Sequence, residues 1–306
     1  MDNVAVTGCA GFIGFHTTRL LLKEGYHVTG IDNLNDYYDP RRKEANLAAL
    51  SHENFAFVKG DINDLDLEPL VRDAGVIHLA GRGGVRQSWE DFSRYVNDNI
   101  LATKRLLDAA LAGDVSRLVY ASSSSVYGNA ETPFRETARP EPISPYGITK
   151  LAAEHLTRTY PFSTTALRYF TVYGPRQRED MAFSRFIAAI LDEQPLPLYG
   201  DGTQTRDFTF VEDIAHANVL ALRSKNEGVY NIGGGARVSM RDVITVLEEN
   251  TGKKAKVNAG DAETGDVRHT HADTSKAREE LGYVPGTSLK EGLRRQVDWV
   301  ISEQQR

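Results

Sequence analysis

Short hydrophobic runs alternate with longer amphipathic stretches along the first half of the chain. The runs are rich in β-branched residues and predict strands at 4–7, 27–31, 55–58, 76–79, 118–122 and 164–169. Apolar residues at helical spacing predict helices at 12–23, 95–112 and 145–160. Strands that alternate with helices in this way favour an α/β fold built on a doubly wound parallel sheet.

The alternation loosens after residue 173, where proline and glycine interrupt the pattern, most clearly in the segment 233–235. We therefore expect a first domain over 1–173 and a smaller C-terminal α/β substrate lobe over 174–306, with some chain returning to the first domain. Ser239 with Asp242, and Ser288 with Glu291, have capping-box spacing and predict the starts of two lobe helices.

Composition narrows the class of protein. The 306 residues are 41% hydrophobic and carry a net charge of -6 without a basic stripe, so neither nucleic acid nor a membrane is expected as a partner. There is no long apolar run and no signal-peptide pattern, and Cys9 is the single cysteine, which together favour a cytoplasmic location. We expect no metal site.

A glycine-rich turn between the first strand and the first helix is the first candidate site. Gly8, Gly11 and Gly14 are spaced GxxGxxG, with Phe12 and Ile13 opening the helix. Glycines at this place let backbone amides approach a pyrophosphate at the helix N-terminus. On their own they are equally typical of a tight turn.

Asp32 follows the second predicted strand, at the place of a carboxylate that binds the adenosine ribose diol. Asn33 and Asn35 come next and supply no adjacent cation for a 2′-phosphate, while Arg41 and Arg42 lie several positions later. NAD is therefore favoured over NADP. Weaker candidates for the same site follow later strands: Asp61, Ile62, Leu79, Ala80 and Gly81.

Ser144 and Pro145 are typical of the N-cap and the first turn of a helix. Tyr146 and Lys150 then lie four residues apart on one face of that helix. A nearby ammonium favours the phenolate, so Tyr146 is a candidate base. Upstream, Ser122 and Ser123 end the fifth strand, where ligands of doubly wound sheets bind. We expect Ser123 to hydrogen-bond the reacting oxygen.

With these motifs in this order, the whole chain resembles the extended short-chain dehydrogenase/reductase family, and among its members the sugar-nucleotide epimerases. The resemblance implies a Rossmann domain with bound NAD and Tyr146 as the base. It places Lys150 at the nicotinamide ribose and Ser123 in a position to assist Tyr146. It further implies a UDP-sugar as substrate and a homodimer packed through the helices near 95–112 and 145–160. Positions that match cofactor or nucleotide contacts of the family are Asn99, Phe170, Tyr199, Arg206 and Arg268.

Three segments, 30–40, 121–128 and 170–175, look most like UDP-glucuronate 4-epimerases. A substrate carboxylate needs hydrogen-bond donors, and the candidates are Arg86, Ser123, Ser124, Ser125, Thr171 and Arg178. Oxidation of a glucuronate at C4 gives a β-keto acid, which decarboxylates when its carboxylate bond aligns with the carbonyl π system. These donors are expected to hold the carboxylate out of that alignment.

Alternatives remain open at this point. The same hydroxyls suit a neutral hexose, as in UDP-glucose/UDP-galactose 4-epimerases, and UDP-glucuronate decarboxylases share the first oxidation. A 4,6-dehydratase needs an acidic residue where Ser124 and Ser125 stand, and a non-enzymatic NAD sensor needs neither Tyr146 nor Lys150. The segment 81–86 departs from the family's usual alanine-rich form, and Pro161 follows the catalytic helix early.

Overall fold

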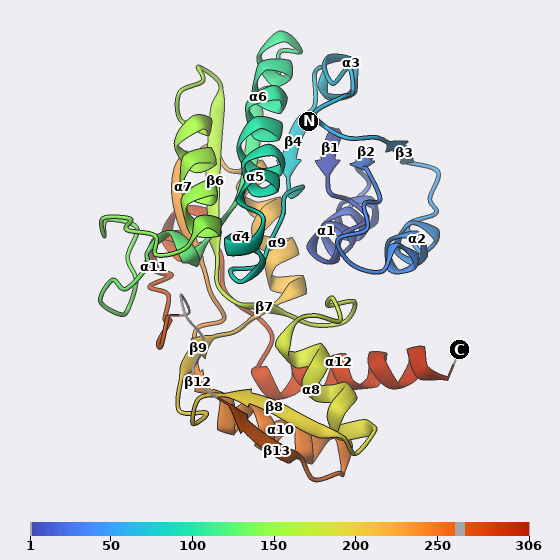
Figure 1. Cartoon of the computed structure of the whole chain (residues 1–306). Helices are drawn as coiled ribbons and strands as arrows, with labels where there is room; N and C mark the ends of the chain where they lie inside the picture. Colours follow the sequence, from blue (N-terminus) through green and yellow to red (C-terminus); the bar gives the residue numbers. More distant parts are fainter. Residues whose placement is uncertain (1, 261–266, 306) are drawn as a thin grey trace.

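Seven parallel strands form the centre of the computed structural model, which describes residues 2–260 and 267–305. Their order across the sheet is β11-β6-β5-β4-β1-β2-β3, and their carboxyl ends point toward a smaller lobe (Figure 1). The prediction of a doubly wound α/β sheet is confirmed. The strands are β1 (Asn3–Thr7), β2 (His27–Asp32), β3 (Phe55–Lys59), β4 (Gly75–His78), β5 (Arg117–Ser123), β6 (Ser163–Tyr169) and β11 (Gly228–Ile232).

Helices cover both faces of the sheet because residues along each strand alternate between two apolar cores. One core contains Val4 and Val6 and is covered by α1 (Phe12–Lys23) and α9 (Val211–Arg223). The other contains Ala5 and is covered by α3 (Glu68–Val71), α6 (Ala102–Ala112) and α7 (Pro145–Thr157). The inner strands are thus buried on both faces, as is typical of parallel sheets, whereas the edge strand β3 has no buried residue.

The lobe has its own core of aromatic and aliphatic side chains. Its helices are α8 (Ala182–Leu191), α10 (Met240–Thr251) and α12 (Leu289–Gln304), which pack around β8 (Pro195–Tyr199). Three two-stranded pairs complete it: β8 with β13 (Lys256–Gly260), β9 (Thr205–Asp207) with β12 (Arg237–Ser239), and β7 (Val172–Tyr173) with β10 (Thr209–Phe210). The short helix α11 (Ser275–Leu281) packs against β11 of the central sheet.

Local signals in the sequence explain where several helices begin. The α7 prediction is confirmed at its N-terminus, where the Ser144 hydroxyl accepts from the Gly147 amide at 3.1 Å. The capping box at Ser239 is present before α10, and Ser288 caps α12.

The predicted helix over 95–112 is interrupted in the structure. It consists of α5 (Phe92–Tyr95), a π-helical segment over Val96–Leu101 and then α6. The sequence pattern also did not predict α2 (Pro40–Ala48), α3, α4 (Gln87–Glu90), α8, α9 and α11, or the 3-10 turn (Ser124–Val126) that follows β5.

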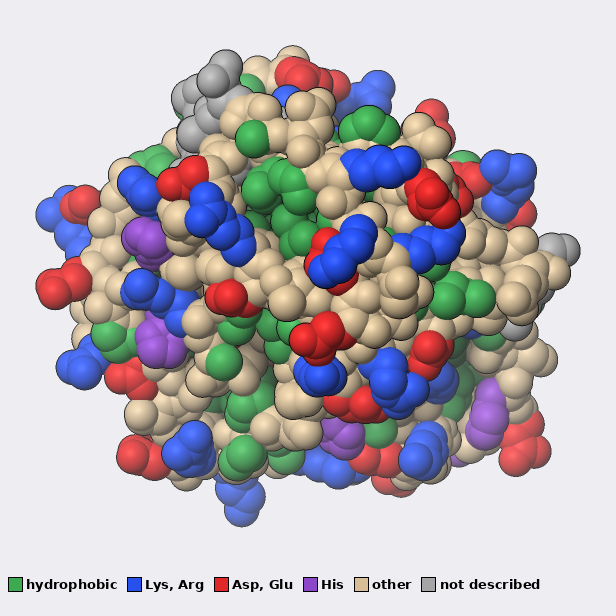
Figure 2. Space-filling view, turned by 90° about the horizontal axis from the view of Figure 1, so that it is seen from below, with side chains coloured by type: hydrophobic (Ala, Val, Ile, Leu, Met, Phe, Trp, Pro, Cys, Tyr) green, Lys and Arg blue, Asp and Glu red, His purple; other side chains and the backbone are tan. Residues whose placement is uncertain are grey.

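Charged side chains of both signs are mixed over the lobe end of the molecule, with hydrophobic side chains between them (Figure 2). Mixed surfaces of this kind create no strong field of one sign. Among the described residues, no helix combines the length and apolar character that crossing a bilayer requires.

Candidate active site

The turn between β1 and α1 keeps the N-terminus of α1 open. Gly8 has a φ of +72°, and a Cβ at Gly14 would lie 1.9 Å from the carbonyl oxygen of Gly8. Only glycine lets the helix pack this closely on the turn. No side chain caps α1 and its first turn holds no acidic residue, so its amides and positive dipole end are available to an anion.

The carboxylate of Asp32 is anchored at the end of β2. Its oxygens accept hydrogen bonds from the amides of Ala10 at 3.2 Å and Leu34 at 2.9 Å. Beside it, the Asn33 side-chain amide donates to Asp61 at 2.8 Å. The structure therefore brings together Asp32, Asn33 and Asp61, which sequence reasoning had placed in one site from different strands.

Asn99 lies behind the cavity wall and outside its lining. It is 2% exposed and accepts a 2.7 Å hydrogen bond from the Arg82 amide. Its own amide group donates to the Thr149 hydroxyl on α7 at 3.0 Å. Asn99 thus ties the loop after β4 to the helix that carries Tyr146.

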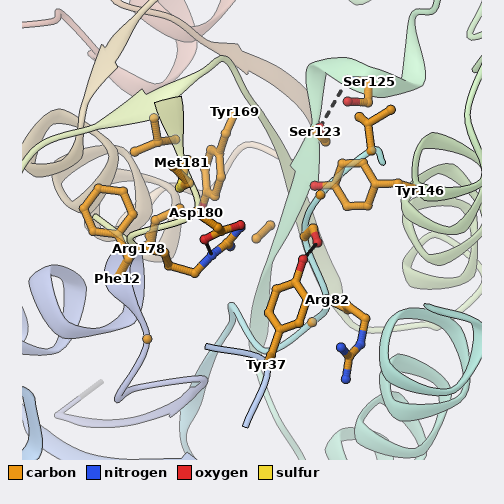
Figure 3. Close-up of a pocket in the computed structure, with 18 of the residues that line it drawn as sticks. Phe12, Tyr37, Arg82, Ser123, Ser125, Tyr146, Tyr169, Arg178, Asp180 and Met181 are labelled. Atoms are coloured by element: carbon orange, nitrogen blue, oxygen red, sulfur yellow. Dashed lines mark hydrogen bonds and ion pairs between the residues drawn. The ribbon is translucent and has the colours of Figure 1, made fainter. Parts of the chain in front are cut away.

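Tyr146, Ser123 and Lys150 all line the cavity between the sheet and the lobe. The Tyr146 hydroxyl points into the cavity, with Ser123 and Ser125 at its side (Figure 3). Burial is the largest influence on Tyr146 and raises its pKa, while the hydrogen bond with Ser123 and the charge of Arg178 oppose that rise. The ammonium of Lys150, which the sequence predicts to favour the phenolate, is not among the groups that shift the pKa of Tyr146.

Lys150 is buried against an aromatic ring. Its ammonium lies 4.7 Å from the centroid of the Tyr120 ring, and burial lowers its pKa to about 8. The carboxylate of Glu154, one turn further along α7, opposes that lowering. Lys150 therefore titrates close to neutral pH in the cofactor-free protein.

The wall opposite Tyr146 carries an ion pair. Arg178 and Asp180 reach into the cavity from that side (Figure 3), and Arg178 donates to both carboxylate oxygens, at 2.9 and 3.0 Å. The ring of Tyr37 lies against Arg178, and its hydroxyl donates to the Gly83 carbonyl. The predicted residues Arg86, Ser124, Ser125 and Thr171 also line the cavity.

Arg206 lines the lobe end of the cavity, and its guanidinium donates to the carbonyl oxygens of Thr205 and Arg268, each at 3.0 Å. The Arg268 side chain is not part of the cavity lining. The side chain of Tyr199 and residues 265–266, which belong to the predicted nucleotide-binding segments, lie outside the described residues.

Apart from Asn99 and Arg268, the groups that act through their side chains line one continuous cavity of about 900 Å³, at the upper end of the range for small-molecule sites. Its lining contains the other predicted cofactor positions: Gly8, Gly11, Phe12, Ile13, Gly14, Asn35, Ile62, Leu79, Ala80, Gly81, Ser122 and Phe170.

Lining residues that sequence reasoning did not assign include Tyr37, Lys43, Arg82 and Asp180. They come from loops and from α2, where no strand end or spacing rule indicated a site. Among the described residues no group of three or more His, Cys, Asp or Glu that could hold a metal ion occurs.

The comparisons place this chain in a family. Residues 4–233 match the model of the NAD dependent epimerase/dehydratase family, and the chain belongs to that family. A UDP-glucuronate 4-epimerase of Thermodesulfobacterium geofontis is 43% identical, with 98% of this chain and 96% of that protein covered.

Solved structures agree with this assignment. The UDP-glucuronic acid 4-epimerase of Bacillus cereus, in complex with UDP-glucuronic acid and NAD, is 43% identical and superimposes with a TM-score of 0.95 over 98% of this chain and 99% of that one. A UDP-glucose 4-epimerase of Thermotoga maritima with UDP-glucose is 32% identical, with a TM-score of 0.91 and 99% of each chain covered. The fold alone is therefore compatible with charged and with neutral hexoses.

Proposed function

We propose that this chain is a UDP-glucuronate 4-epimerase, which interconverts UDP-glucuronate and UDP-galacturonate through a 4-keto intermediate while NAD stays bound. The observation that carries the proposal is the position of the Tyr146 hydroxyl, hydrogen-bonded with Ser123 where the glycine-loop half of the cavity meets the lobe half. Identity of 43% along nearly the whole chain to epimerases of this specificity supports the same substrate.

The glycine loop and Asp32 fit a dinucleotide. The open N-terminus of α1 suits the pyrophosphate, and the anchored Asp32 carboxylate suits the ribose diol. Asp61 with Asn33 would contact the adenine end, and residues 79–81 with Phe170 would flank the nicotinamide half. Residues 1–173 would thus hold most of the cofactor, and the lobe within 174–306 would hold the UDP group.

Tyr146 would take the proton of the C4 hydroxyl, with Ser123 bonded to the same oxygen and Lys150 at the nicotinamide ribose. Bound NAD supplies a reversible hydride acceptor and, when oxidised, a positive charge that favours the Tyr146 phenolate. The 4-keto sugar then turns in the pocket and exposes its other face before it is reduced. The dinucleotide and the sugar nucleotide would share the cavity of about 900 Å³ that runs between the sheet and the lobe.

The carboxylate of the substrate would be held by Ser124, Ser125 and Thr171, with Arg86 and Arg178 near it. Held out of alignment with the C4 carbonyl, the carboxylate survives the oxidation. Arg206, with Tyr199 and Arg268 as further candidates, would bind the diphosphate and uridine.

We further propose that the protein forms a homodimer and is located in the cytoplasm. Four large apolar side chains are exposed on neighbouring helical segments of one side of the sheet domain: Trp89, Phe92, Leu101 and Ile148. Such a patch suits burial against a second copy of the chain. The buried thiol of Cys9 is compatible with a reducing compartment.

Product analysis tests the substrate and the outcome together. The purified protein would be incubated separately with UDP-glucuronate, UDP-glucose and UDP-galactose, and the products resolved by chromatography and mass spectrometry. We expect UDP-galacturonate at unchanged mass from the first substrate. UDP-xylose with loss of carbon dioxide would identify a decarboxylase, and turnover of the neutral sugars alone would identify a glucose/galactose epimerase.

Tyr146→Phe tests the assigned base. We expect a loss in kcat of at least about a hundredfold, the order of general-base contributions, with NAD content unchanged. Tyr160→Phe is the matched control, because Tyr160 follows α7 and its hydroxyl bonds to the exposed Asp108 outside the cavity. Near-normal turnover by Tyr146→Phe would refute the mechanism.

A further inference from the structure

A buried lysine lies at the adenosine end of the cavity. Lys43, from α2, is 5% exposed, and its ammonium lies 3.5 Å from an Asp32 oxygen. The same ammonium donates to the side-chain oxygen of Asn35 at 2.9 Å and lies 5.2 Å from the centroid of the Tyr38 ring. Lys43, Asp32, Asn33 and Asn35 all line the cavity.

The ammonium of Lys43 depends on Asp32 for its charge balance. Burial has the largest effect on Lys43 and lowers its pKa, and the cations Arg82 and Arg178 lower it further. The charge and hydrogen bond of Asp32 raise the pKa of Lys43 and so oppose this shift. The ribose end of the site therefore holds one positive and one negative charge side by side, both shielded from solvent.

The neighbouring arginines do not take part in this pair. Arg41 is bonded to Asp39, and Arg42 is paired with Glu179 at 2.7 Å. Neither arginine lines the cavity, whereas Lys43 does. Although eleven positions separate it from Asp32 in the sequence, Lys43 is the cation that α2 turns toward the ribose site.

NAD and NADP differ by the phosphate on the adenosine 2′-oxygen. A carboxylate at the ribose diol accepts from the hydroxyls and repels that phosphate, while a nearby cation accommodates it. NAD-specific sites gain their selectivity from the carboxylate and need no cation beside it. This site holds both groups.

We propose that Lys43 is a latent partner for a 2′-phosphate and that the Asp32 carboxylate is the barrier that keeps NADP out. The inference rests on the proposed binding of NAD in this cavity. Removal of the Asp32 charge leaves Lys43 buried and facing the ribose, with the Asn33 and Asn35 side chains beside it, and a bound 2′-phosphate would replace the carboxylate as the anion that stabilises its ammonium. The site then has the charge that an anion requires.

The test compares four proteins: the unchanged chain, Asp32→Ser, Lys43→Met and the double variant. Cofactor-free preparations would be titrated with NAD⁺ and with NADP⁺ by calorimetry, and dinucleotides extracted from freshly purified protein would be quantified by chromatography. Asp32→Asn serves as a second single variant, because it keeps the size of the side chain and one oxygen that can accept from the amide of Ala10 or of Leu34, which bond to separate oxygens of Asp32.

We expect Asp32→Ser or Asp32→Asn to bind NADP⁺ roughly 10- to 100-fold more tightly than the unchanged chain does, the size of a charge-assisted contact. Adding Lys43→Met should abolish that gain and leave NAD⁺ affinity close to that of the Asp32 variant. The gained NADP⁺ affinity should also fall with ionic strength more steeply than NAD⁺ affinity.

Two results would overturn the inference: Asp32 variants that gain no NADP⁺ affinity, or a gain that persists without Lys43. Failure of the unchanged chain to bind NAD⁺ would instead refute the proposed cofactor. The two failures are therefore distinguishable in the same titrations.

Discussion

Replacement of Glu154 by glutamine should strongly destabilise the protein. Glu154 lies beneath the active site and is 1% exposed, and Arg168 contacts its two oxygens at 2.6 and 3.0 Å. The Ser122 hydroxyl donates to the same carboxylate at 2.6 Å. The Arg168 guanidinium, which also stacks on the Tyr127 ring, has one terminal nitrogen without a hydrogen-bond partner among the residues that the structure describes.

The expected loss follows from what Glu154→Gln leaves behind. The substitution keeps the size of the side chain but leaves the Arg168 charge uncompensated at 3% exposure. Breaking a buried pair on one side costs about 3–5 kcal/mol of unfolding free energy. Replacing both partners by apolar residues of similar volume, as in Glu154→Leu with Arg168→Met, should recover most of that loss because neither member of the pair is left buried without the other.

Urea unfolding followed by circular dichroism on cofactor-free protein measures these differences. The control is Asp298→Asn, which removes one partner of an exposed helix-surface pair with Arg294 and should leave the urea midpoint unchanged. A single-variant loss below about 1 kcal/mol would refute the reasoning, since that is the size of a neutral hydrogen bond. A double variant as unstable as the single one would also refute it.

Three further predictions concern the cofactor site. The pKa of Lys150 is about 8 against an ordinary 10.5. The free-energy cost of burying its charge therefore applies in full below pH 8 and vanishes as pH rises to 10.5. Lys150→Met should stabilise the cofactor-free protein at pH 7 by up to roughly 3 kcal/mol, measured by urea unfolding. Equal stability of the two proteins at pH 7 would contradict this. Gly14→Ala should abolish NAD binding or folding, because its Cβ would lie 1.9 Å from the Gly8 carbonyl oxygen. Gly11→Ala should have a milder effect, because its Cβ would lie 3.2 Å from the same oxygen. The dinucleotide content of the two purified variants measures this difference. The Cys9 thiol is fully buried and burial raises its pKa, so Ellman's reagent should label it only after denaturation. Rapid labelling of the native protein would show that the turn opens.

Strand ends and helix starts were the predictable part of this protein. The helix over 12–23 has the predicted bounds, since a glycine turn precedes it and Gly25 follows it. Ser123 and Tyr146 were identifiable because a hydroxyl at a strand end and a YxxxK pattern on a capped helix are local features.

What escaped prediction depends on contacts between distant segments. The π-helical segment within 95–112 is only six residues long, too short for hydrophobic periodicity to distinguish it from the α-helix that follows. From the sequence alone, Lys43 cannot be distinguished from a surface lysine, because only the packing of α2 places it beside Asp32. The balance of burial and charge that sets the Tyr146 pKa likewise depends on Arg178, which comes from a segment 32 positions away in the sequence.

The position of β11 at the edge of the sheet has a consequence for how the chain is made. β11 pairs with β6, yet the whole of α8 and the strands β8 to β10 separate them in the sequence. On the ribosome, the face that α9 covers stays exposed until residue 223 has left the exit tunnel, and the outer edge of β6 stays unpaired until residue 232 has done so. A fragment that stops at residue 173 would therefore present an open sheet edge and should aggregate, so the cofactor half cannot be produced by simple truncation at that point.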